Sequence, residues 1–340
     1  MPKKGIYIAI ILVFLLITLF GCGNNQQDDY TSEPTESALP TDEESPQDES
    51  TPEPADIELP DILKDGAESM LKVYDIKQEK IIELTAKEYL YGVVAGEVGN
   101  DWPEEVLKAQ AIIARTFMVD HFVNEDTSMY EGADISTDVS ESQAYNADDV
   151  NEAIKKAVDD TQGMIMTYDG EIVKAFFHSC SGGITATAVE GLEHEEDLPY
   201  LQPVKSDDSG APPENREWSG EFSKEKLQTA LASMEEDIGD FDSVEIGETG
   251  PSGRALTLKF GEAEVSCPQL RMAISASEFR STLIEEINYA DGVLTVKGKG
   301  FGHGVGMPQW DAKQLAENGE NAEEIILTYF LDVDIATVWE

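Results

Sequence analysis

The sequence predicts an α+β fold, with a single region of mixed sheet and helices and a smaller subdomain inserted around residues 205–285. Strand-like and helix-like segments come in clusters, without the strict strand–helix–strand alternation of a parallel α/β protein. Hydrophobic residues make up 41% of the 340 residues, which is enough to fill a globular interior. We expect this domain to occupy residues 67–340, with its first strand near Met70.

The charge balance excludes one class of partner. The chain has 69 acidic and 23 basic residues, a net charge of −46. Nucleic acid phosphates, and anionic lipids that recruit proteins by charge, would be repelled. Such an acid excess fits a salty or alkaline habitat, in which self-repulsion is screened or tolerated.

The N-terminus has the pattern of an export signal. Lys3 and Lys4 precede an uncharged, mostly apolar run over residues 5–20, which suits a signal-peptide core and is short for a membrane span. The run ends in "LFGC", which resembles a bacterial lipobox and implies cleavage after residue 21 and a lipid on Cys22. The alternative is an uncleaved signal anchor. Both place the rest of the chain outside the cytoplasm, and the lipobox places it on the outer face of the cytoplasmic membrane.

Residues 22–66 are predicted to be a disordered acidic tether. Pro, Ser, Thr, Gln, Asp and Glu dominate, and Lys64 is the first basic residue after Lys4. Such a segment buries too little apolar surface to offset its ordering entropy, and its charges keep it extended.

The first predicted elements lead to one acidic residue. Residues 70–84 alternate as a hairpin with its turn at 77–80. Thr85 and Glu88 then form a capping-box pattern. The helix that follows is apolar until Glu97, which makes Glu97 either a helix-end charge or a functional acid.

A second helix is predicted from Trp102-Pro103, with Pro at its first turn and two acids beside the positive end of its dipole. Lys108 and Arg115 interrupt its apolar run seven residues apart, so they share one face. They either extend to solvent from a half-buried helix or form a cationic edge of a cleft near Glu97.

The remaining elements follow from periodicity and turn signals. Residues 124–148 are predicted to be irregular, and Asp169-Gly170 is the best hairpin signal. Predicted helices are 150–161, 223–234, 277–287, 311–318 and 322–330; predicted strands flank residues 169–170, lie around 244 and 256, and cover 292–300.

Two glycine-rich segments each contain a histidine. "GKGFGHGVGMPQW" holds His303 among five glycines, and "FFHSCSGG" holds His178 at a strand end. Glycines permit tight turns and close approach of a ligand, and such loops often carry function. On the residues alone, a structural turn with a packed histidine is the better interpretation.

Four blocks in order carry a specific resemblance: "YLYGVVAGEVGNDWPEEVLKAQAIIARTF", "DVSESQAY", "FFHSCSGGITA" and "GKGFGHGVGMPQWDAKQLAENG". A fifth, "GPSGRALTL", is weaker. With these blocks the chain resembles the stage II sporulation protein D family, whose members include lytic transglycosylases and amidase enhancers of the bacterial wall. The blocks span nearly all of the predicted folded region.

The resemblance implies roles for individual residues. Glu97 stands at the family's catalytic acid. Matched positions with an implied substrate-binding role are Lys108, Arg115, Gln143, Tyr145, His178, Ser179, Ser181, His303 and Gln309. Pro308 stands where the family usually has Ser, which puts one hydroxyl contact in doubt, and Cys180 stands where Ser, Thr or Ala is common.

The implied reaction needs one carboxyl group. A hydrolytic glycosidase usually uses two carboxylates. A lytic transglycosylase instead uses the C6 hydroxyl of N-acetylmuramic acid, and one Glu can protonate the leaving oxygen and accept the hydroxyl proton. Glu97 must then be protonated at rest, with a pKa raised by burial beside Trp102. Lys108 and Arg115 are therefore expected to point at substrate oxygens or to lie several ångströms away. The expected products are 1,6-anhydro-muramyl glycans, cut from strands whose stem peptides a partner amidase has removed during cell-wall remodelling.

Two other interpretations remain open. The same motifs could form a non-catalytic peptidoglycan-binding lipoprotein that enhances an amidase. Some relatives carry a zinc near the histidine segment, so His178 and Cys180 are candidate ligands, joined by His194, Cys267 or His303 if the fold permits. A lone His-x-Cys is a weak zinc signal, and nothing in the sequence lowers the pKa of the Cys180 thiol. No cofactor is expected to be required.

Overall fold

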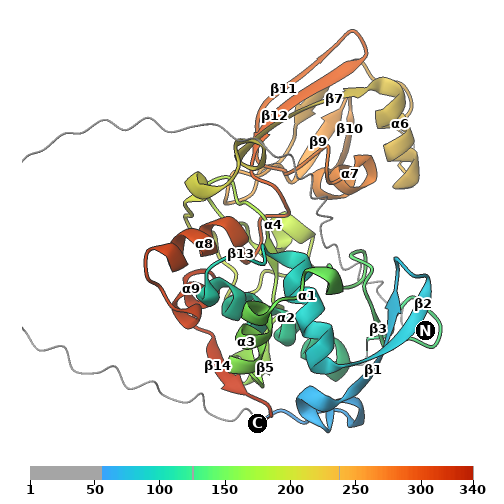
Figure 1. The fold of residues 1–340 in the computed structure, drawn as a ribbon. Helices are drawn as coiled ribbons and strands as arrows, with labels where there is room; N and C mark the ends of the chain where they lie inside the picture. Colours follow the sequence, from blue (N-terminus) through green and yellow to red (C-terminus); the bar gives the residue numbers. More distant parts are fainter. Residues whose placement is uncertain (1–55, 125, 237, 340) are drawn as a thin grey trace, which may run out of the picture.

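The structure is a computed structural model that describes residues 56–124, 126–236 and 238–339. The predicted signal peptide, Cys22 and most of the predicted tether lie outside the described residues. The described chain has the predicted α+β fold, with helices and several small sheets. It forms two lobes, a larger one around α1, α2 and α8 and a smaller one around β7, β12 and α6 (Figure 1).

Folded structure begins earlier than predicted. Two 3₁₀ turns, η1 (Asp61–Leu63) and η2 (Gly66–Glu68), precede the first strand. Leu63 is fully buried, and Ile57, Leu59 and Ile62 pack against the same core. The predicted tether boundary at residue 66 is therefore too late, because four apolar side chains within an acidic segment suffice to attach it to the domain.

The first predicted hairpin and helix are confirmed. Strands β1 (Met70–Asp75) and β2 (Lys80–Thr85) pair antiparallel, and β3 (Ile135–Ser136) adds to β1 in parallel. Helix α1 (Ala86–Glu97) starts at Thr85, whose side chain accepts the Glu88 N–H while Glu88 caps the Thr85 N–H. The capping box therefore fixes the start of the helix that carries Glu97 at its other end.

Helix α2 (Glu104–Val123) is the central helix of the larger lobe. It packs against α1, α3, α8, α9 and β4. One of its faces joins the core of α1 and the β1–β2 hairpin, with Leu107, Ala111 and Met118. Another face, with Val106, Ile112 and Ile113, joins the core of the C-terminal helices.

The chain then forms the elements around α2. They are η3 (Ala147–Asp149), α3 (Glu152–Asp160), β4 (Met164–Tyr168), β5 (Glu171–Ile172), β6 (Phe177–His178), α4 (Ala188–Leu192), β13 (Met307–Pro308), α8 (Gln309–Glu317), α9 (Ala322–Tyr329) and β14 (Asp334–Thr337). The sheet β14-β4-β5 contains the predicted Asp169-Gly170 hairpin. Parallel pairing of β13 with β6 sets Pro308 opposite His178.

The smaller lobe has its own core, separate from those around α2, and is inserted between α4 and β13. The chain first forms η4 (Asp208–Gly210), which packs on α8. The elements of the lobe are α5 (Pro213–Arg216), β7 (Glu217–Ser223), α6 (Lys224–Ser233), β8 (Val244–Ile246), β9 (Thr257–Phe260), β10 (Ala263–Ser266), α7 (Cys267–Ile274), β11 (Ile284–Ala290) and β12 (Val293–Lys299). Two sheets, β10-β9-β8 and β11-β12-β7, enclose Phe222, Phe260 and Phe279. The lobe therefore extends to residue 299, beyond the predicted end at 285.

The predicted helix over 277–287 is wrong. The helix lies at Cys267–Ile274, and residues 284–290 form β11. Asp291 and Gly292 both have positive φ and turn β11 into β12, as in an Asp-Gly hairpin. Within the described ranges, no helix is long and apolar enough to cross a membrane.

Candidate active site

Glu97 is the last residue of α1, and its side chain is 5% exposed. Its Oε1 accepts the backbone N–H of Ala144 at 2.6 Å. The Nε2 of Gln309 donates to the Glu97 carbonyl at 3.1 Å and lies 3.4 Å from Oε1 of the buried Gln110. Segments about 50 and 210 residues away along the chain thus meet at this residue.

Burial raises the pKa of the Glu97 carboxyl to about 8, and the hydrogen bonds from Ala144 and Gln309 lower it without offsetting the burial. No charged side chain within the described residues contributes to this shift. The position at the negative end of the α1 dipole also disfavours a carboxylate. Glu97 is therefore protonated at neutral pH, as the sequence predicted.

Two glycines of α1 let the 143–146 segment lie across the helix. A Cβ on Gly92 would lie 2.1 Å from the Tyr145 ring, and one on Gly96 would lie 2.7 Å from the Ala144 carbonyl carbon. The N–H of Asn146 donates to the Gly92 carbonyl at 2.8 Å. This close contact delivers the Ala144 amide to Glu97.

The predicted residues Gln143 and Tyr145 support this segment. Gln143 is fully buried, and its Nε2 donates to the Ala114 carbonyl of α2. Tyr145 is half-buried and stacks on Tyr89 with ring centroids 6.1 Å apart. Gln143 therefore fastens the 143–146 segment to α2 and, being fully buried, is not placed to contact a substrate.

His178 and His303 hold the glycine-rich loop from both sides. Nδ1 of His178 lies 3.0 Å from the Val305 carbonyl, and Nδ1 of His303 lies 3.1 Å from the Val305 N–H. Because a carbonyl oxygen only accepts, Nδ1 of His178 is the donor in the first bond. Because a backbone N–H only donates, Nδ1 of His303 is the acceptor in the second. Burial lowers the pKa of His303 to about 3 and that of His178 well below its usual range, so both rings are neutral. They position the backbone that leads to Gln309.

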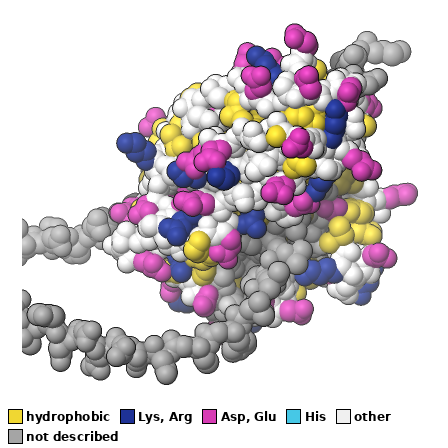
Figure 2. Space-filling model, turned by 90° about the horizontal axis from the view of Figure 1, so that it is seen from above, with side chains coloured by type: hydrophobic (Ala, Val, Ile, Leu, Met, Phe, Trp, Pro, Cys, Tyr) yellow, Lys and Arg dark blue, Asp and Glu magenta, His cyan; other side chains and the backbone are white. Residues whose placement is uncertain are grey.

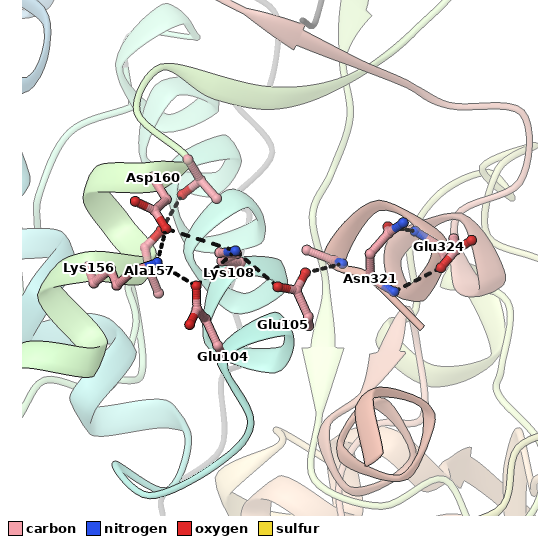
Figure 3. Close-up of polar contacts among 10 residues, drawn as sticks. Glu104, Glu105, Lys108, Lys156, Ala157, Asp160, Asn321 and Glu324 are labelled. Atoms are coloured by element: carbon pink, nitrogen blue, oxygen red, sulfur yellow. Dashed lines mark hydrogen bonds and ion pairs between the residues drawn. The ribbon is translucent and has the colours of Figure 1, made fainter. Parts of the chain in front are cut away.

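Lys108 lies in an acidic network on the outside of α2 (Figure 3). Its Nζ is 3.0 Å from Glu104 and 2.9 Å from Glu105. The other oxygen of Glu105 accepts the N–H of Ala322, and Glu104 also binds Lys156 of α3 at 2.6 Å. The network joins α2 to α3 and α9, so the prediction of a cationic edge beside Glu97 is wrong for Lys108.

Arg115 lies two turns further along the same face of α2 as Lys108, where it is buried against the end of α3, with 1% of its surface exposed. Its guanidinium donates to the carbonyls of Val158 and Met164, at 3.0 and 3.1 Å, and to the Thr161 hydroxyl. These bonds close the end of α3 and the start of β4. The prediction that Arg115 contacts substrate is therefore wrong. Neither Lys108 nor Arg115 is among the causes of the pKa shift of Glu97.

The S-G-G segment is built around Asp208. This carboxylate accepts the Ser181 hydroxyl at 2.9 Å and the N–H groups of Gly182 and Gly183 at 2.6 and 2.9 Å. Ser181 is fully buried, so it shapes the turn and does not face a ligand. Its neighbour Ser179 accepts the Trp310 N–H through its carbonyl, at 3.2 Å.

The residues proposed for zinc do not form a site. Nδ1 of His178 is engaged with Val305, and burial raises the pKa of the Cys180 thiol, which disfavours the thiolate needed by a metal or a nucleophile. Among the described residues, no group of three or more His, Cys, Asp or Glu side chains is placed to hold a metal ion. We therefore derive no step through a metal or a thiol.

Several residues at the site were missed by the sequence reasoning. Gln110 lies within the first motif block, and Arg254, which donates to the Ser181 carbonyl at 2.6 Å, lies within the weak fifth block. The motif positions were available signals for both. Trp102 and Trp310 pack against each other beside Glu97, a contact that separation along the chain conceals.

The fold and site together define an α+β protein with one buried, protonated carboxyl where four separated segments meet. A stage II sporulation protein domain matches residues 74–168, and a domain of unknown function, DUF8618, matches residues 214–306, the smaller lobe.

Curated relatives support the match to the stage II sporulation protein family. An uncharacterised protein of Brachyspira hyodysenteriae is 30% identical, covering 74% of this chain and 67% of the relative. Stage II sporulation protein D of Bacillus amyloliquefaciens is 30% identical, covering 80% and 82%. The amidase enhancer of Bacillus subtilis is 26% identical, covering 71% and 39%. The chain belongs to the stage II sporulation protein D family.

Proposed function

We propose that the protein is a lytic transglycosylase that cuts the bond between N-acetylmuramic acid and N-acetylglucosamine in peptide-stripped glycan strands during sporulation. The observation that carries the proposal is the burial of Glu97, which raises the pKa of its carboxyl to about 8 and so keeps the carboxyl protonated at neutral pH. A carboxyl that is neutral at rest is the form a one-carboxyl mechanism needs, because it must first donate a proton.

In this mechanism Glu97 acts twice. Its proton passes to the O4 leaving oxygen of N-acetylglucosamine as the C1–O4 bond breaks. The resulting carboxylate accepts the proton of the C6 hydroxyl as that oxygen bonds to C1 of the same muramyl ring. The product is a 1,6-anhydro sugar, water does not enter, and Glu97 ends protonated as it began.

The direct test is digestion of peptide-stripped strands by the wild-type chain, Glu97→Gln and Glu245→Gln, with products identified by mass spectrometry. Glu245 is an exposed acid of β8 and serves as the matched control. We expect anhydro products from wild type and Glu245→Gln and none from Glu97→Gln. Equal product from Glu97→Gln would refute the role of Glu97.

A second candidate function is enhancement of a partner amidase, which the amidase-enhancer relative favours. Here the site binds glycan without cutting it. Release of stem peptides by a purified wall amidase, with and without this chain, separates the two. Equal stimulation by wild type and Glu97→Gln, with no anhydro product from either, would support the enhancer and exclude the lytic proposal.

The proposal includes export and lipidation at Cys22, which would attach the domain to the outer face of the cytoplasmic membrane. What supports it is the pattern of residues 3–22, which lie outside the described residues. Cys22→Ala should move the chain from the membrane fraction to the medium or the soluble extracytoplasmic fraction. Retention of Cys22→Ala in the membrane would contradict lipid anchoring.

A further inference from the structure

We propose that Lys313, held over Trp102 and Trp310, binds the free lactyl carboxylate of a muramyl residue and thereby selects peptide-stripped glycan. The inference rests on the proposed function, since it names the chemical group that the same site recognises. It assigns this selection to a residue of α8.

The two indoles belong to chain segments that meet at Glu97, since Trp102 follows it by five residues and Trp310 follows Gln309. Their ring centroids lie 4.8 Å apart with planes inclined by 58°. Trp102 folds back over the segment after Glu97, because a Cβ on Gly99 would lie 2.3 Å from its Nε1. Trp310 directly follows Gln309, which donates to the Glu97 carbonyl. Both indoles are half-buried, so part of each ring remains open for contact with the apolar face of a sugar.

Lys313 is fixed over this pair. It lies one turn after Gln309 on α8, so the two side chains share a face of the helix. Its Nζ is 5.6 Å from the centroid of the Trp102 ring and 5.2 Å from that of Trp310, within the range of cation–π attraction. The aromatic pair thus holds a positive charge at the edge of the Glu97 site.

This charge has a looser ion-pair partner than the other paired lysines of the described ranges. Glu317 lies 3.5 Å from Nζ, and the Lys313 side chain is 28% exposed. Every other lysine that forms an ion pair within the described ranges has a carboxylate oxygen within 2.9 Å. An ammonium has three N–H donors, so Lys313 has donors to offer an incoming anion.

The substrate chemistry supplies that anion. When an amidase removes a stem peptide, the lactyl group of N-acetylmuramic acid is left as a free carboxylate, whereas in peptide-bearing glycan the same carbonyl is a neutral amide. A chain with a net charge of −46 repels an anionic strand. An open ammonium at the site offsets that repulsion for the stripped strand.

The test measures binding in a Glu97→Gln background, which stops turnover and keeps the side chain neutral. Isothermal titration at neutral pH, where the lactyl carboxylate is ionised and Lys313 is protonated, compares stripped strands with the same strands after carbodiimide amidation of their lactyl carboxylates. We expect Glu97→Gln to bind the free-carboxylate strands about 3- to 10-fold more tightly, and Glu97→Gln/Lys313→Met to bind both strands equally, at the weaker level.

Two variants control the result. Glu97→Gln/Lys297→Met removes an exposed lysine of β12 and should keep the preference; Glu97→Gln/Lys313→Arg keeps the charge and should also keep it. A preference that survives Lys313→Met, or one that Lys297→Met removes equally, would overturn the proposal. If wild type makes no anhydro product but the Lys313-dependent preference holds, the lytic function fails and this inference stands.

Discussion

The carboxyl of Glu97 gains its properties from position more than from neighbours. It lies at the C-terminus of α1, where the dipole opposes a negative charge, and it is removed from water with one amide donor on Oε1. An acid with this environment donates its proton readily near neutral pH and can accept one in the next step.

The raised pKa of Glu97 predicts the pH dependence of lysis. Only the protonated carboxyl starts the reaction, so kcat/KM should be constant below pH 8 and fall about tenfold per pH unit above it. The measurement is kcat/KM on stripped strands across the pH range in which the chain stays folded. An activity that rises with pH through 8 would mean that Glu97 acts first as a base.

The sequence predicts the burial and the raised pKa of Glu97 but not the contacts of the two cations. An apolar run that ends in one acid predicts burial directly. Arg115 shares a helix face with Lys108 at a spacing of seven, yet it turns toward the carbonyls of Val158 and Met164, which only the folded chain brings near. The contrast shows that spacing identifies a face but not what that face meets.

Arg115→Met tests this assignment. It removes the guanidinium donors to the carbonyls of Val158 and Met164, so the free energy of unfolding should fall by about 2–4 kcal/mol. Chemical denaturation measures the loss, with Lys155→Met, an exposed lysine of α3, as a control that should change stability by less than about 0.5 kcal/mol. A substrate contact would instead raise KM and leave stability unchanged.

Among the elements, α1 and the 143–146 segment fit together through missing side chains. Gly92 and Gly96 are four residues apart and form a smooth face for Tyr145 and Ala144. The two glycines therefore allow the 143–146 segment to approach α1 closely. This approach places the Ala144 amide against the Glu97 carboxyl.

Gly96→Ala should separate these two surfaces. The substitution favours an isolated helix by up to about 1 kcal/mol, but the new Cβ would press on the Ala144 backbone, so we expect a net destabilisation of about 1–3 kcal/mol. The Ala144 amide should also move from Glu97 and lysis should weaken. A more stable Gly96→Ala with unchanged kcat would show that the contact does not position the acid.

Turn chemistry explains which elements could be predicted. Asp169-Gly170 and Asp291-Gly292 both adopt positive φ at the two central positions of a hairpin. The Asp169-Gly170 signal predicts its hairpin. The Asp291-Gly292 signal competes with a helix-like pattern over residues 277–287, which leads to the wrong prediction of a helix where β11 begins. Helix α2 begins where Trp102-Pro103 predicts. Its two buried faces could not be assigned from the sequence, because each of the two cores is completed by segments distant in sequence.

The whole molecule combines the larger lobe, which carries Glu97, with an inserted smaller lobe, and the chain has a net charge of −46. Asp and Glu side chains are spread over the face shown in Figure 2, with Lys and Arg between them. Arg254, from the inserted lobe, donates to the carbonyls of Ser181 and Ile184 next to the histidine loop. The inserted lobe was predicted from its mixed pattern, but its end at β12 depends on pairing with β7, which the local sequence does not encode.

The charge excess predicts a salt-dependent stability. Screening weakens repulsion between like charges, so the melting temperature should rise by several degrees between about 0.05 M and about 1 M NaCl. Differential scanning calorimetry at constant pH measures this. A melting temperature that does not change with salt would contradict the hypothesis of a salty or alkaline habitat as the origin of the composition.

In the proposed reaction an internal hydroxyl attacks in place of water, and one carboxyl group handles both protons. Digestion of stripped strands by the wild-type chain in ¹⁸O-labelled water, followed by mass spectrometry of the products, tests this step. We expect muramyl ends that lack one water relative to hydrolysis products and carry no ¹⁸O, together with loss of these products in Glu97→Gln. Muramyl ends that carry ¹⁸O at C1 would show hydrolysis and refute the transglycosylase reaction.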